Sequence, residues 1–430
     1  MTCIDCGAVK NDRNAYSCGC GGIWEIRRSI EILDGERLRR QFDERLGLRT
    51  GLYASGVWRY RELIAPELPE ETLVSRGEGN TGLYESAVAA GYAGVGRMWF
   101  KAQSENPSGS FKDNGMVVAI SHGRSLGHRL FACSSTGNTS ASLAMYAAWC
   151  GLQSLVLAPA KGVSPAKIVQ TAAYGARIVA FEGTYDDGIR FLQQHAEKLG
   201  AYVCNSLNPY RIEGQKSIVF ELAQQLGWTL PDWIILPGGA LSNVSALGKG
   251  LEELHALGLI ARMPRIALVQ AEGASPFHRM VQSGAESLVP EQSPHTRASA
   301  LNIGNPPSWR KALRALRLTN GVTVSVGDEE IMAAKRVIDG AGIGCEPASA
   351  ATLAGALKLR ASHTIDASET VACLLTGHLL KDIDALIELY GSPPASIGSL
   401  REYDSEVDLH RIFHEERAVD NAVGTIRIED

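Results

Sequence analysis

The chain has 430 residues, 45% of them hydrophobic and 21% charged, which is ordinary for a globular enzyme of about two or three domains. Its formal net charge of −5 argues against nucleic acid or an anionic membrane as the main partner. No signal peptide is visible and no apolar run is long enough to span a membrane, so we expect a cytoplasmic protein without membrane contact. The nine cysteines, an odd number, suit this reducing compartment better than a disulfide framework.

The chain opens with four cysteines in two close pairs, Cys3 with Cys6 and Cys18 with Cys20. Four thiolates satisfy a tetrahedral zinc ion, and each close pair suits a tight turn. The spacing therefore predicts a zinc-ribbon-like segment over residues 1–28 that holds a structural zinc. The alternative is a degenerate ribbon of reduced thiols without metal. A catalytic zinc is not expected, because no histidine accompanies the four cysteines.

From about residue 99 onward, short apolar runs alternate with helix-length amphipathic segments. The predicted strands are Met98–Ala102, Arg129–Cys133, Ser154–Ala158, Arg177–Phe181, Trp233–Leu236, Arg265–Gln270 and Val371–Thr376. The predicted helices include Phe111–Leu126, Ser140–Cys150, Pro165–Tyr174, Tyr185–Leu199, Ile212–Leu226, Ser245–Leu257, Glu329–Asp339 and Ala348–Leu359. This alternation predicts an α/β fold with a mostly parallel sheet and helices on both faces. Ligands then collect at the carboxyl ends of the strands.

Lys112 follows the first predicted strand, in the turn Asn106–Asp113 that opens the first predicted helix. A lysine held at a fixed turn can form a Schiff base with a carbonyl cofactor. The Ser/Gly-rich turn before it lets the backbone approach that cofactor closely. The alternative is a solvated surface lysine near a helix start, which is the commoner situation for an isolated lysine.

The loop Ser134–Ser140 follows the second predicted strand and also opens a helix. Backbone N–H groups and hydroxyls at a helix N-terminus form an anion site, which suits a substrate carboxylate. A plain Ser/Thr helix cap is the alternative, but seven small polar residues exceed what a cap needs.

Two further loops carry groups suited to phosphate. Asn205, Ser206 and Arg211 offer an amide, a hydroxyl and a guanidinium within seven residues, with an Asx turn and a surface arginine as the alternative. The glycine-containing loop Pro237–Asn243 follows a predicted strand and precedes a helix, so its amides are suited to face an anion; a tight turn is the alternative. Thr376 ends the last predicted strand, where its hydroxyl can meet a pyridine nitrogen; a threonine at a strand end is also common.

With these loops in view, the chain resembles the threonine synthase family, whose members are pyridoxal-phosphate enzymes of fold type II. The resemblance extends from about Cys3 to Leu389. It rests on the four cysteines and on the motifs Gly77–Thr81, Asn106–Asp113, Ser134–Ser142, Asn205–Lys216, Ile303–Pro306, Cys345–Ala350 and Leu375–His378. The sequence departs from the family pattern at Asn114, where Arg is usual, and at Ala240 and Ser242, where Asn and Gly are expected.

The resemblance implies two lobes with twisted, mostly parallel sheets flanked by helices. It implies a large cofactor-binding domain formed by residues 29–112 and 206–395, and a small mobile domain formed by residues 113–205. Residues 396–430 are left as a C-terminal tail. A homodimer is the family expectation.

The resemblance also implies a role for each matching residue. Lys112 is expected to hold pyridoxal 5'-phosphate and then to act as the general base. The expected cofactor contacts are Asn138 to the ring oxygen, Gly238, Gly239, Ala240, Leu241, Ser242 and Asn243 to the phosphate, and Thr376 to the pyridine nitrogen. The expected substrate contacts are Ser135, Thr136 and Thr139, with Asn205, Ser206 and Arg211 on the leaving phosphate.

The implied activity is conversion of O-phospho-L-homoserine and water to L-threonine and phosphate, by γ-elimination and β-addition of water. Three other hypotheses stay open. The first is a related synthase or lyase, for example a cysteate-synthase-like enzyme, that acts on another phosphorylated amino acid. The second is a non-catalytic binding protein that kept the fold, although it has not lost Lys112. The third is a zinc-dependent function.

Overall fold

The computed structural model describes residues 1–10, 18–160 and 165–391. One compact unit, Met1–Ala385, holds two mostly parallel sheets and a small N-terminal ribbon, and the chain from Leu386 belongs to a second unit. The predicted tail, residues 396–430, lies outside the described residues. None of the described helices is both long and apolar enough to cross a membrane.

The N-terminal part of the chain is a two-stranded ribbon followed by short helices. Strands β1 (Thr2–Cys3) and β2 (Trp24–Glu25) pair antiparallel. The Asp34 side chain accepts from Arg37 N and so caps the first long helix. The helices of this part are α1 (Gly35–Leu46), η1 (Leu52–Ala54), η2 (Trp58–Tyr60), α2 (Arg61–Ile64) and η3 (Glu70–Thr72).

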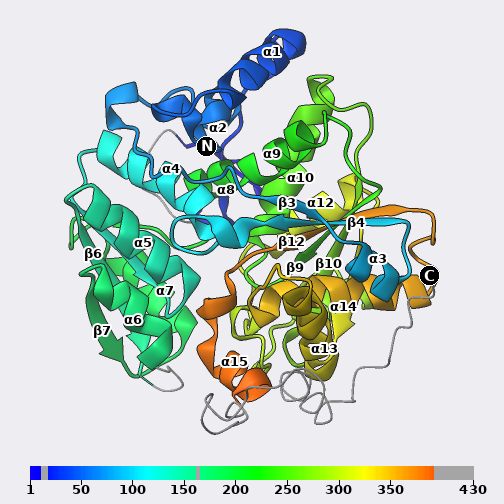
Figure 1. Cartoon of the computed structure of the whole chain (residues 1–430). Coiled ribbons are helices and arrows are strands. Elements are labelled where there is room, and N and C mark those ends of the chain that lie inside the picture. Colours follow the sequence, from blue (N-terminus) through cyan, green and yellow to red (C-terminus); the bar gives the residue numbers. More distant parts are fainter. Residues whose placement is uncertain (11–17, 161–164, 392–430) are drawn as a thin grey trace, which may run out of the picture. The chain divides into compact units, whose positions relative to one another are not determined.

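The larger sheet has six strands in the order β11-β10-β9-β12-β4-β3 (Figure 1). Its strands are β3 (Leu83–Glu85), β4 (Arg97–Ala102), β9 (Trp233–Pro237), β10 (Arg265–Ala271), β11 (Val322–Val326) and β12 (Thr370–Leu375). All pairs are parallel except the edge pair β3–β4. The α/β prediction is therefore confirmed, and the carboxyl ends of β4, β12 and β9 lie side by side.

Helices cover both faces of this sheet. Helix α14 (Pro347–Ala361) packs on β9, β10, β11 and β12, where Gly355 lies against Val269. Because side chains alternate along a strand, Ile266 and Leu268 of β10 face the other way, into the core that α10 (Ser242–Ala256) and α12 (Trp309–Leu318) share. The remaining elements of the first unit are α3 (Ala87–Ala93), η4 (Gln103–Glu105), η5 (Glu272–Ala274), α11 (Pro276–Ser283), η6 (Ser299–Leu301), α13 (Asp328–Gly340) and η7 (Leu379–Lys381). Helix α15 (Ile383–Tyr390) begins in the first unit and ends in the second.

The smaller sheet has four parallel strands in the order β7-β6-β5-β8. Its strands are β5 (Leu130–Ser134), β6 (Gln153–Pro159), β7 (Arg177–Phe181) and β8 (Ala201–Val203), and its helices are α5 (Asn138–Trp149), α6 (Pro165–Ala173) and α7 (Tyr185–His195). Helices α5 and α7 both pack on β5 and β6. Buried Leu192 of α7 packs with Ala132 of β5 and Leu157 of β6 in a small core.

Two helices join the sheets. Helix α4 (Lys112–Ser125) leads into the smaller sheet and α8 (Pro209–Gln215) leads out of it. They contact each other through their backbones, since a Cβ built on Gly214 would lie 2.0 Å from Asn114 O and one on Gly115 would lie 2.7 Å from Arg211 O. Only glycine fits such an approach.

The prediction of a single helix over Ile212–Leu226 is wrong. Helix α8 begins earlier, at Pro209, because the Asn208 side chain caps it and proline suits its first position. It ends at Gln215, and α9 (Ser217–Gln225) begins after Lys216. Ser217 Oγ donates to Gly214 O at 2.7 Å and so competes for a carbonyl that a helical amide would otherwise use.

Candidate active site

A cavity of about 1320 Å³ lies at the carboxyl ends of β4, β9 and β12 of the larger sheet and of β5 of the smaller one. Twelve of the residues predicted for the site line it: Lys112, Ser135, Thr136, Asn138, Thr139, Ser206, Gly239, Ala240, Leu241, Ser242, Asn243 and Thr376. Three predicted residues, Asn205, Arg211 and Gly238, are not part of its wall. The structure thus brings together four loops that are distant in the sequence.

The lysine loop is fixed against the end of β12. Phe111 N donates to Thr376 O at 3.0 Å, and His378 N donates to Gly109 O at 2.9 Å. Gly109 adopts a φ of 84°, a left-handed conformation that glycine tolerates. These bonds place Lys112, the first residue of α4, beside Thr376 at one edge of the sheet.

Lys112 has the electrostatics of a reactive amine. Burial lowers its pKa, the guanidinium of Arg211 lowers it further, and the carboxyl of Glu346, when ionised, opposes them, so that the pKa of Lys112 is about 7. A lysine in this range is neutral in a large fraction of molecules at neutral pH and is able to accept a proton or attack a carbonyl.

The carboxyl of the next residue, Asp113, accepts the hydrogen bonds that hold this loop in place. Ser108 donates to its carboxyl through both N and Oγ, at 2.6 Å each, and Ser142 of α5 donates as well. Burial raises the pKa of Asp113 to about 6 despite these hydrogen bonds. Asp113 therefore ties the lysine loop to α5, which also presents the predicted substrate loop.

The predicted substrate loop follows β5. Ser135 N donates to Leu157 O at 3.1 Å and Gly137 N to Ser135 Oγ at 3.3 Å, so the chain turns sharply into α5. Asn138 is the first residue of α5 and donates through Nδ2 to Glu346 Oε2 at 2.9 Å. The loop is therefore linked to the larger sheet across the cavity.

The predicted phosphate cradle lies between β9 and α10. Among the described residues, the backbone N–H groups of Gly239, Ala240 and Leu241 have no hydrogen-bond acceptor. Both amide atoms of Asn243 are buried and also lack a partner in the described chain. A Cβ on Gly239 would lie 2.8 Å from Ala300 O, so the loop needs glycine there. Free donors at the start of a 15-residue helix fit a phosphate group.

Arg211 is a fully buried cation without a counter-ion among the described residues. Its Nη1 donates to Cys204 O at 2.9 Å, while Nε and Nη2 have no partner there. Ser206 Oγ is likewise buried and without a partner in the described chain. Asn205 is more constrained, because its side chain accepts from Ser134 N at 3.0 Å and donates to Ser134 O at 2.9 Å. Free, buried donors of this kind suit an anion.

Sequence reasoning missed several titratable residues of the cavity wall, among them Glu346 and Lys381. Glu346 precedes α14, and Lys381 ends η7, where it donates to Gln170 Oε1 of α6 at 2.5 Å. Glu346 belongs to the motif Cys345–Ala350, but the sequence gives its carboxyl no chemical role. Nothing in the spacing of Lys381 pointed to the cavity.

The three departures from the family pattern do not lie in the same place. Asn114 is buried behind the lysine loop, where it accepts from Asn106 at 3.1 Å and donates to Ser217 at 2.9 Å. It does not line the cavity. Ala240 and Ser242 do line it. Only the latter two substitutions therefore change the wall that a ligand meets.

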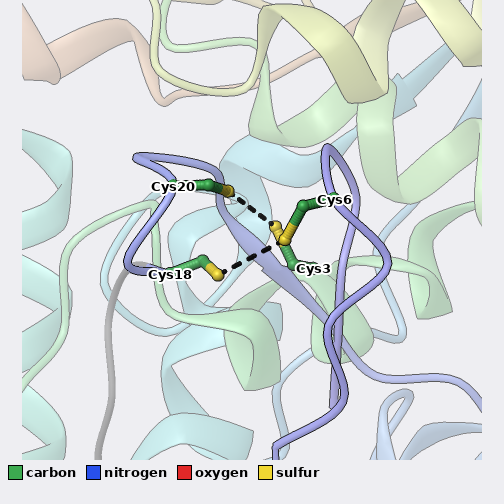
Figure 2. A group of neighbouring side chains, drawn as sticks. All are labelled: Cys3, Cys6, Cys18 and Cys20. Carbon is green, nitrogen blue, oxygen red and sulfur yellow. Dashed lines mark hydrogen bonds between the residues drawn. The ribbon is translucent and has the colours of Figure 1, made fainter.

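The four N-terminal cysteines lie together (Figure 2). All four sulfur atoms are within 4.8 Å of one another, with Cys3 and Cys20 at 3.6 Å and Cys6 and Cys18 at 3.7 Å. A tetrahedral zinc with bonds of about 2.3 Å requires sulfur–sulfur distances of about 3.8 Å. The donor set thus fits zinc, and none of the nine cysteines forms a disulfide.

A family model described as "Pyridoxal-phosphate dependent enzyme" matches residues 74–377. The chain is 39% identical to the threonine synthase of Methanosarcina acetivorans over 411 residues, which cover 94% of this chain and 98% of that protein. It is also 39% identical to the threonine synthase of Methanocaldococcus jannaschii, over 91% of this chain and 95% of that protein. Threonine synthase 2, chloroplastic, of Arabidopsis thaliana is 35% identical over 88% of this chain and 75% of its own length.

Solved structures of lower identity share the fold. Diaminopropionate ammonia lyase from Escherichia coli matches with a TM-score of 0.64 at 17% identity, covering 88% of this chain and 96% of that one. Maize serine racemase matches with a TM-score of 0.59 at 20% identity, covering 81% and 98%. At these identities the likeness concerns architecture alone.

Proposed function

We propose that this chain, which belongs to the threonine synthase family of pyridoxal-phosphate dependent enzymes, converts O-phospho-L-homoserine and water to L-threonine and phosphate. It would then be a carbon–oxygen lyase acting on a phosphate ester. The observation that carries the proposal is the pair of unsatisfied buried donors, Arg211 and Ser206, because Arg211 also acts on a lysine with a lowered pKa.

The described residues fit the cofactor. Lys112 would hold pyridoxal 5'-phosphate through its amine, the free amides of Gly239, Ala240 and Leu241 in the loop Gly238–Asn243 would bind its phosphate, and Asn138 and Thr376 would meet its ring. When bound, the cofactor supplies an electron sink for the negative charge left behind when a proton leaves the substrate.

Lys112 would carry the proton transfers. Once the amino group of the substrate has taken its place on the cofactor, the free Lys112 amine, whose pKa is about 7 in the protein alone, would take the α proton of the substrate. The same amine would then return protons to substrate carbons, because its pKa near 7 lets it both accept and donate. Arg211 supports this role, since its charge helps to keep the Lys112 amine neutral.

Arg211, Ser206 and Asn205 would bind the phosphate that leaves the γ carbon. Arg211 has two unused nitrogens, Nε and Nη2, and Ser206 has an unused hydroxyl. A phosphate dianion would satisfy these donors and the buried charge together. Ser135, Thr136 and Thr139, on the cavity wall, would bind the substrate's carboxylate.

Several wider properties belong to the same proposal. The small domain, residues 113–205, would close over the cavity and exclude water until the addition step. The protein would act as a cytoplasmic homodimer. Slower amide exchange in α6 and α7 on binding of phosphate would support the closure, and sedimentation would test the dimer.

A second candidate is a related enzyme for another phosphorylated amino acid. Ala240 and Ser242, on the cavity wall at two of the three departures, favour it because they alter what a ligand meets. Arg211 and Ser206 favour a phosphorylated substrate in either case.

The experiment is a turnover assay on the purified protein with cofactor and O-phospho-L-homoserine. We expect phosphate and threonine in equal amounts, and their absence would refute the primary proposal. The Lys112→Ala variant should lose both turnover and the visible absorption band of the bound cofactor, whereas Lys358→Ala, a change at a half-exposed surface lysine, should keep both. Turnover of another phosphorylated amino acid alone would select the second candidate.

A further inference from the structure

Thr376 Oγ1 belongs to a chain of hydrogen bonds that runs from Ser349 to Glu346 and on to Asn138. Ser349 and Thr376 are at most 3% exposed, and Glu346 is 4% exposed. Thr376, Glu346 and Asn138 also line the cavity. The direction of each bond in this chain follows from counting hydrogens and lone pairs.

Ser349 fixes the direction of the first bond. Its Oγ accepts from Thr376 N at 2.8 Å and from Gly377 N at 3.1 Å, which occupies both lone pairs. The hydroxyl hydrogen of Ser349 must therefore be donated, and Thr376 Oγ1 is its partner at 3.0 Å. This leaves Thr376 Oγ1 with one lone pair and its own hydrogen for two neighbours: Glu346 Oε1, at 3.1 Å, and the cavity.

The protonation state of Glu346 decides whether the hydrogen of Thr376 Oγ1 is donated to Glu346 or to the cavity. If the carboxyl is ionised, Thr376 donates to it and offers the cavity only a lone pair. If it is neutral, it donates to Thr376, and the threonine hydrogen points into the cavity. In both states Glu346 Oε2 accepts from Asn138 Nδ2 at 2.9 Å, so Asn138 stays in place.

The surroundings shift Glu346 toward the neutral acid. Burial raises the pKa of Glu346, and the hydrogen bonds from Asn138 and Thr376 and the charges of Lys381 and Lys112 do not cancel this effect. These are the cations that face it, from η7 and α4, and burial lowers the pKa of both. The neighbouring Cys345 thiol adds no opposing charge, since burial raises its pKa well above the usual range.

We propose that Glu346 is a positioning residue that, as a neutral carboxylic acid, turns the hydroxyl hydrogen of Thr376 into the cavity. The ligand group that it selects is an unprotonated aromatic nitrogen, which needs a donor. This inference rests on the proposed function, in which that nitrogen is the pyridine nitrogen of the cofactor. An unprotonated nitrogen withdraws electrons less strongly, so the device would temper the electron sink.

The test is a comparison of the wild type with Glu346→Gln. A glutamine can donate to Thr376 through Nε2 and accept from Asn138 through Oε1, so it reproduces the neutral acid and cannot ionise. With ¹⁵N-labelled pyridoxal phosphate bound near neutral pH, we expect the same unprotonated ring-nitrogen resonance in both proteins. At high pH the wild-type resonance should shift, while that of Glu346→Gln should not. A protonated nitrogen in the wild type near neutral pH would overturn the proposal.

A second measurement needs no cofactor and covers the case in which the variant binds it poorly. The infrared spectrum of the cofactor-free wild type should contain a neutral carboxylic acid band that Glu346→Gln lacks. Glu36→Gln, a change at an exposed residue of α1, should leave that band unchanged. Absence of the band overturns the proposal. Failure of the wild type to form any visible cofactor band refutes the proposed function instead, and the two failures are thus distinguishable.

Discussion

Arg211 and Glu213 lie two residues apart on α8, and both are buried, yet their surroundings are opposite. Glu213 meets three cations from three parts of the chain: Arg28, Lys216 at 2.8 Å, and Lys249. Arg211 meets one carbonyl oxygen and, among the described residues, no carboxylate. Burial of a charge is therefore not the sign of a binding site in this protein; a buried charge without compensation is.

The pKa directions express the same contrast. Burial raises the pKa of Glu213, but Lys216, Lys249 and Arg28 outweigh it and hold the carboxyl ionised. Burial lowers the pKa of Arg211, and only weakly polar neighbours oppose that effect. One helix thus presents a satisfied charge toward the N-terminal part of the chain and an unsatisfied one toward the candidate site.

The largest expected effect is on the satisfied charge. Glu213→Gln removes the carboxylate that buried Lys216 and Lys249 and partly buried Arg28 share, so we expect the free energy of unfolding to fall by about 3–5 kcal/mol. Urea denaturation measures it. Glu36→Gln, where the side chain is 92% exposed, serves as the control and should change nothing. A loss equally small in both variants would contradict the comparison.

The second effect concerns Arg211, the charge without a partner, where we expect activity to fall and stability to stay unchanged. Arg211→Met removes a buried charge that nothing compensates, so the stability of the free protein should not fall. We expect kcat/KM for O-phospho-L-homoserine to fall about 100-fold, as when one partner of a buried ion pair is lost. Arg97→Met, at an exposed pair with Glu85, is the matched control. Lost stability with unchanged kcat/KM would make Arg211 a structural residue.

Zinc removal should lower the stability of the part of the protein around Glu213 and should leave phosphate binding near Arg211 unchanged. The segment that carries the four cysteines reaches the Glu213 cluster, because Ile26 O accepts from Lys249 and Arg28 pairs with Glu213. A chelator, or Cys3→Ser, should lower the urea midpoint by less than Glu213→Gln does. Inorganic phosphate should inhibit the zinc-free protein and Cys3→Ser as strongly as it inhibits the untreated wild type. A changed inhibition constant would show that the ribbon acts on the phosphate site.

The thiol pKa values agree with a site that a cation would neutralise. Burial raises the pKa of Cys3, but hydrogen bonds from Cys6 N and Asp5 N and from neighbouring thiols bring it to about 7. The N–H of Gly22 lowers the pKa of Cys20, yet Cys6 and Cys3 raise it to about 12. One thiolate thus opposes the next in the absence of metal.

The smallest expected effect is a pKa change at Lys112. Since Arg211 lowers the pKa of Lys112, Arg211→Met should raise it from about 7 by on the order of one unit. The pH dependence of cofactor loading, which needs the neutral amine, measures this shift. Because folding lowers this pKa from 10.5, the unfolded chain binds more protons between pH 7 and 10.5, and stability of the free protein should rise with pH there. Arg97→Met should show the wild-type profile.

Much of the fold could be predicted, because apolar runs and turn residues mark most elements. All seven predicted strands form, each within one residue of its expected bounds. Strand β8 was not predicted, because three residues are too few to show an alternation of apolar and polar side chains. Strand β11, Val-Thr-Val-Ser-Val, does show this alternation, but it was not predicted either. The division of α8 from α9 depends on a Ser217 side-chain bond, which no periodicity reveals.

Less of the candidate site than of the fold could be predicted from the sequence. Lys112, Asn138 and Thr376 could be named because each follows a strand, and parallel strands bring such loops to one edge. The burial of Arg211 behind the cavity wall could not be named, since it results from the packing of α8 on α4. Glu346 was missed for a similar reason: its two partners come from different sheets.

The backbone contact between α4 and α8 closes a loop of the chain. Strands β5 to β8 leave the larger sheet through α4 and return through α8, so the packing of Gly115 against α8 fixes both ends of this excursion. The entropy of closing a loop grows slowly, by about 0.6 kcal/mol for each doubling of its length. Added residues in the turns of the smaller sheet should therefore cost little, whereas one methyl group on Gly214 should force the two ends apart.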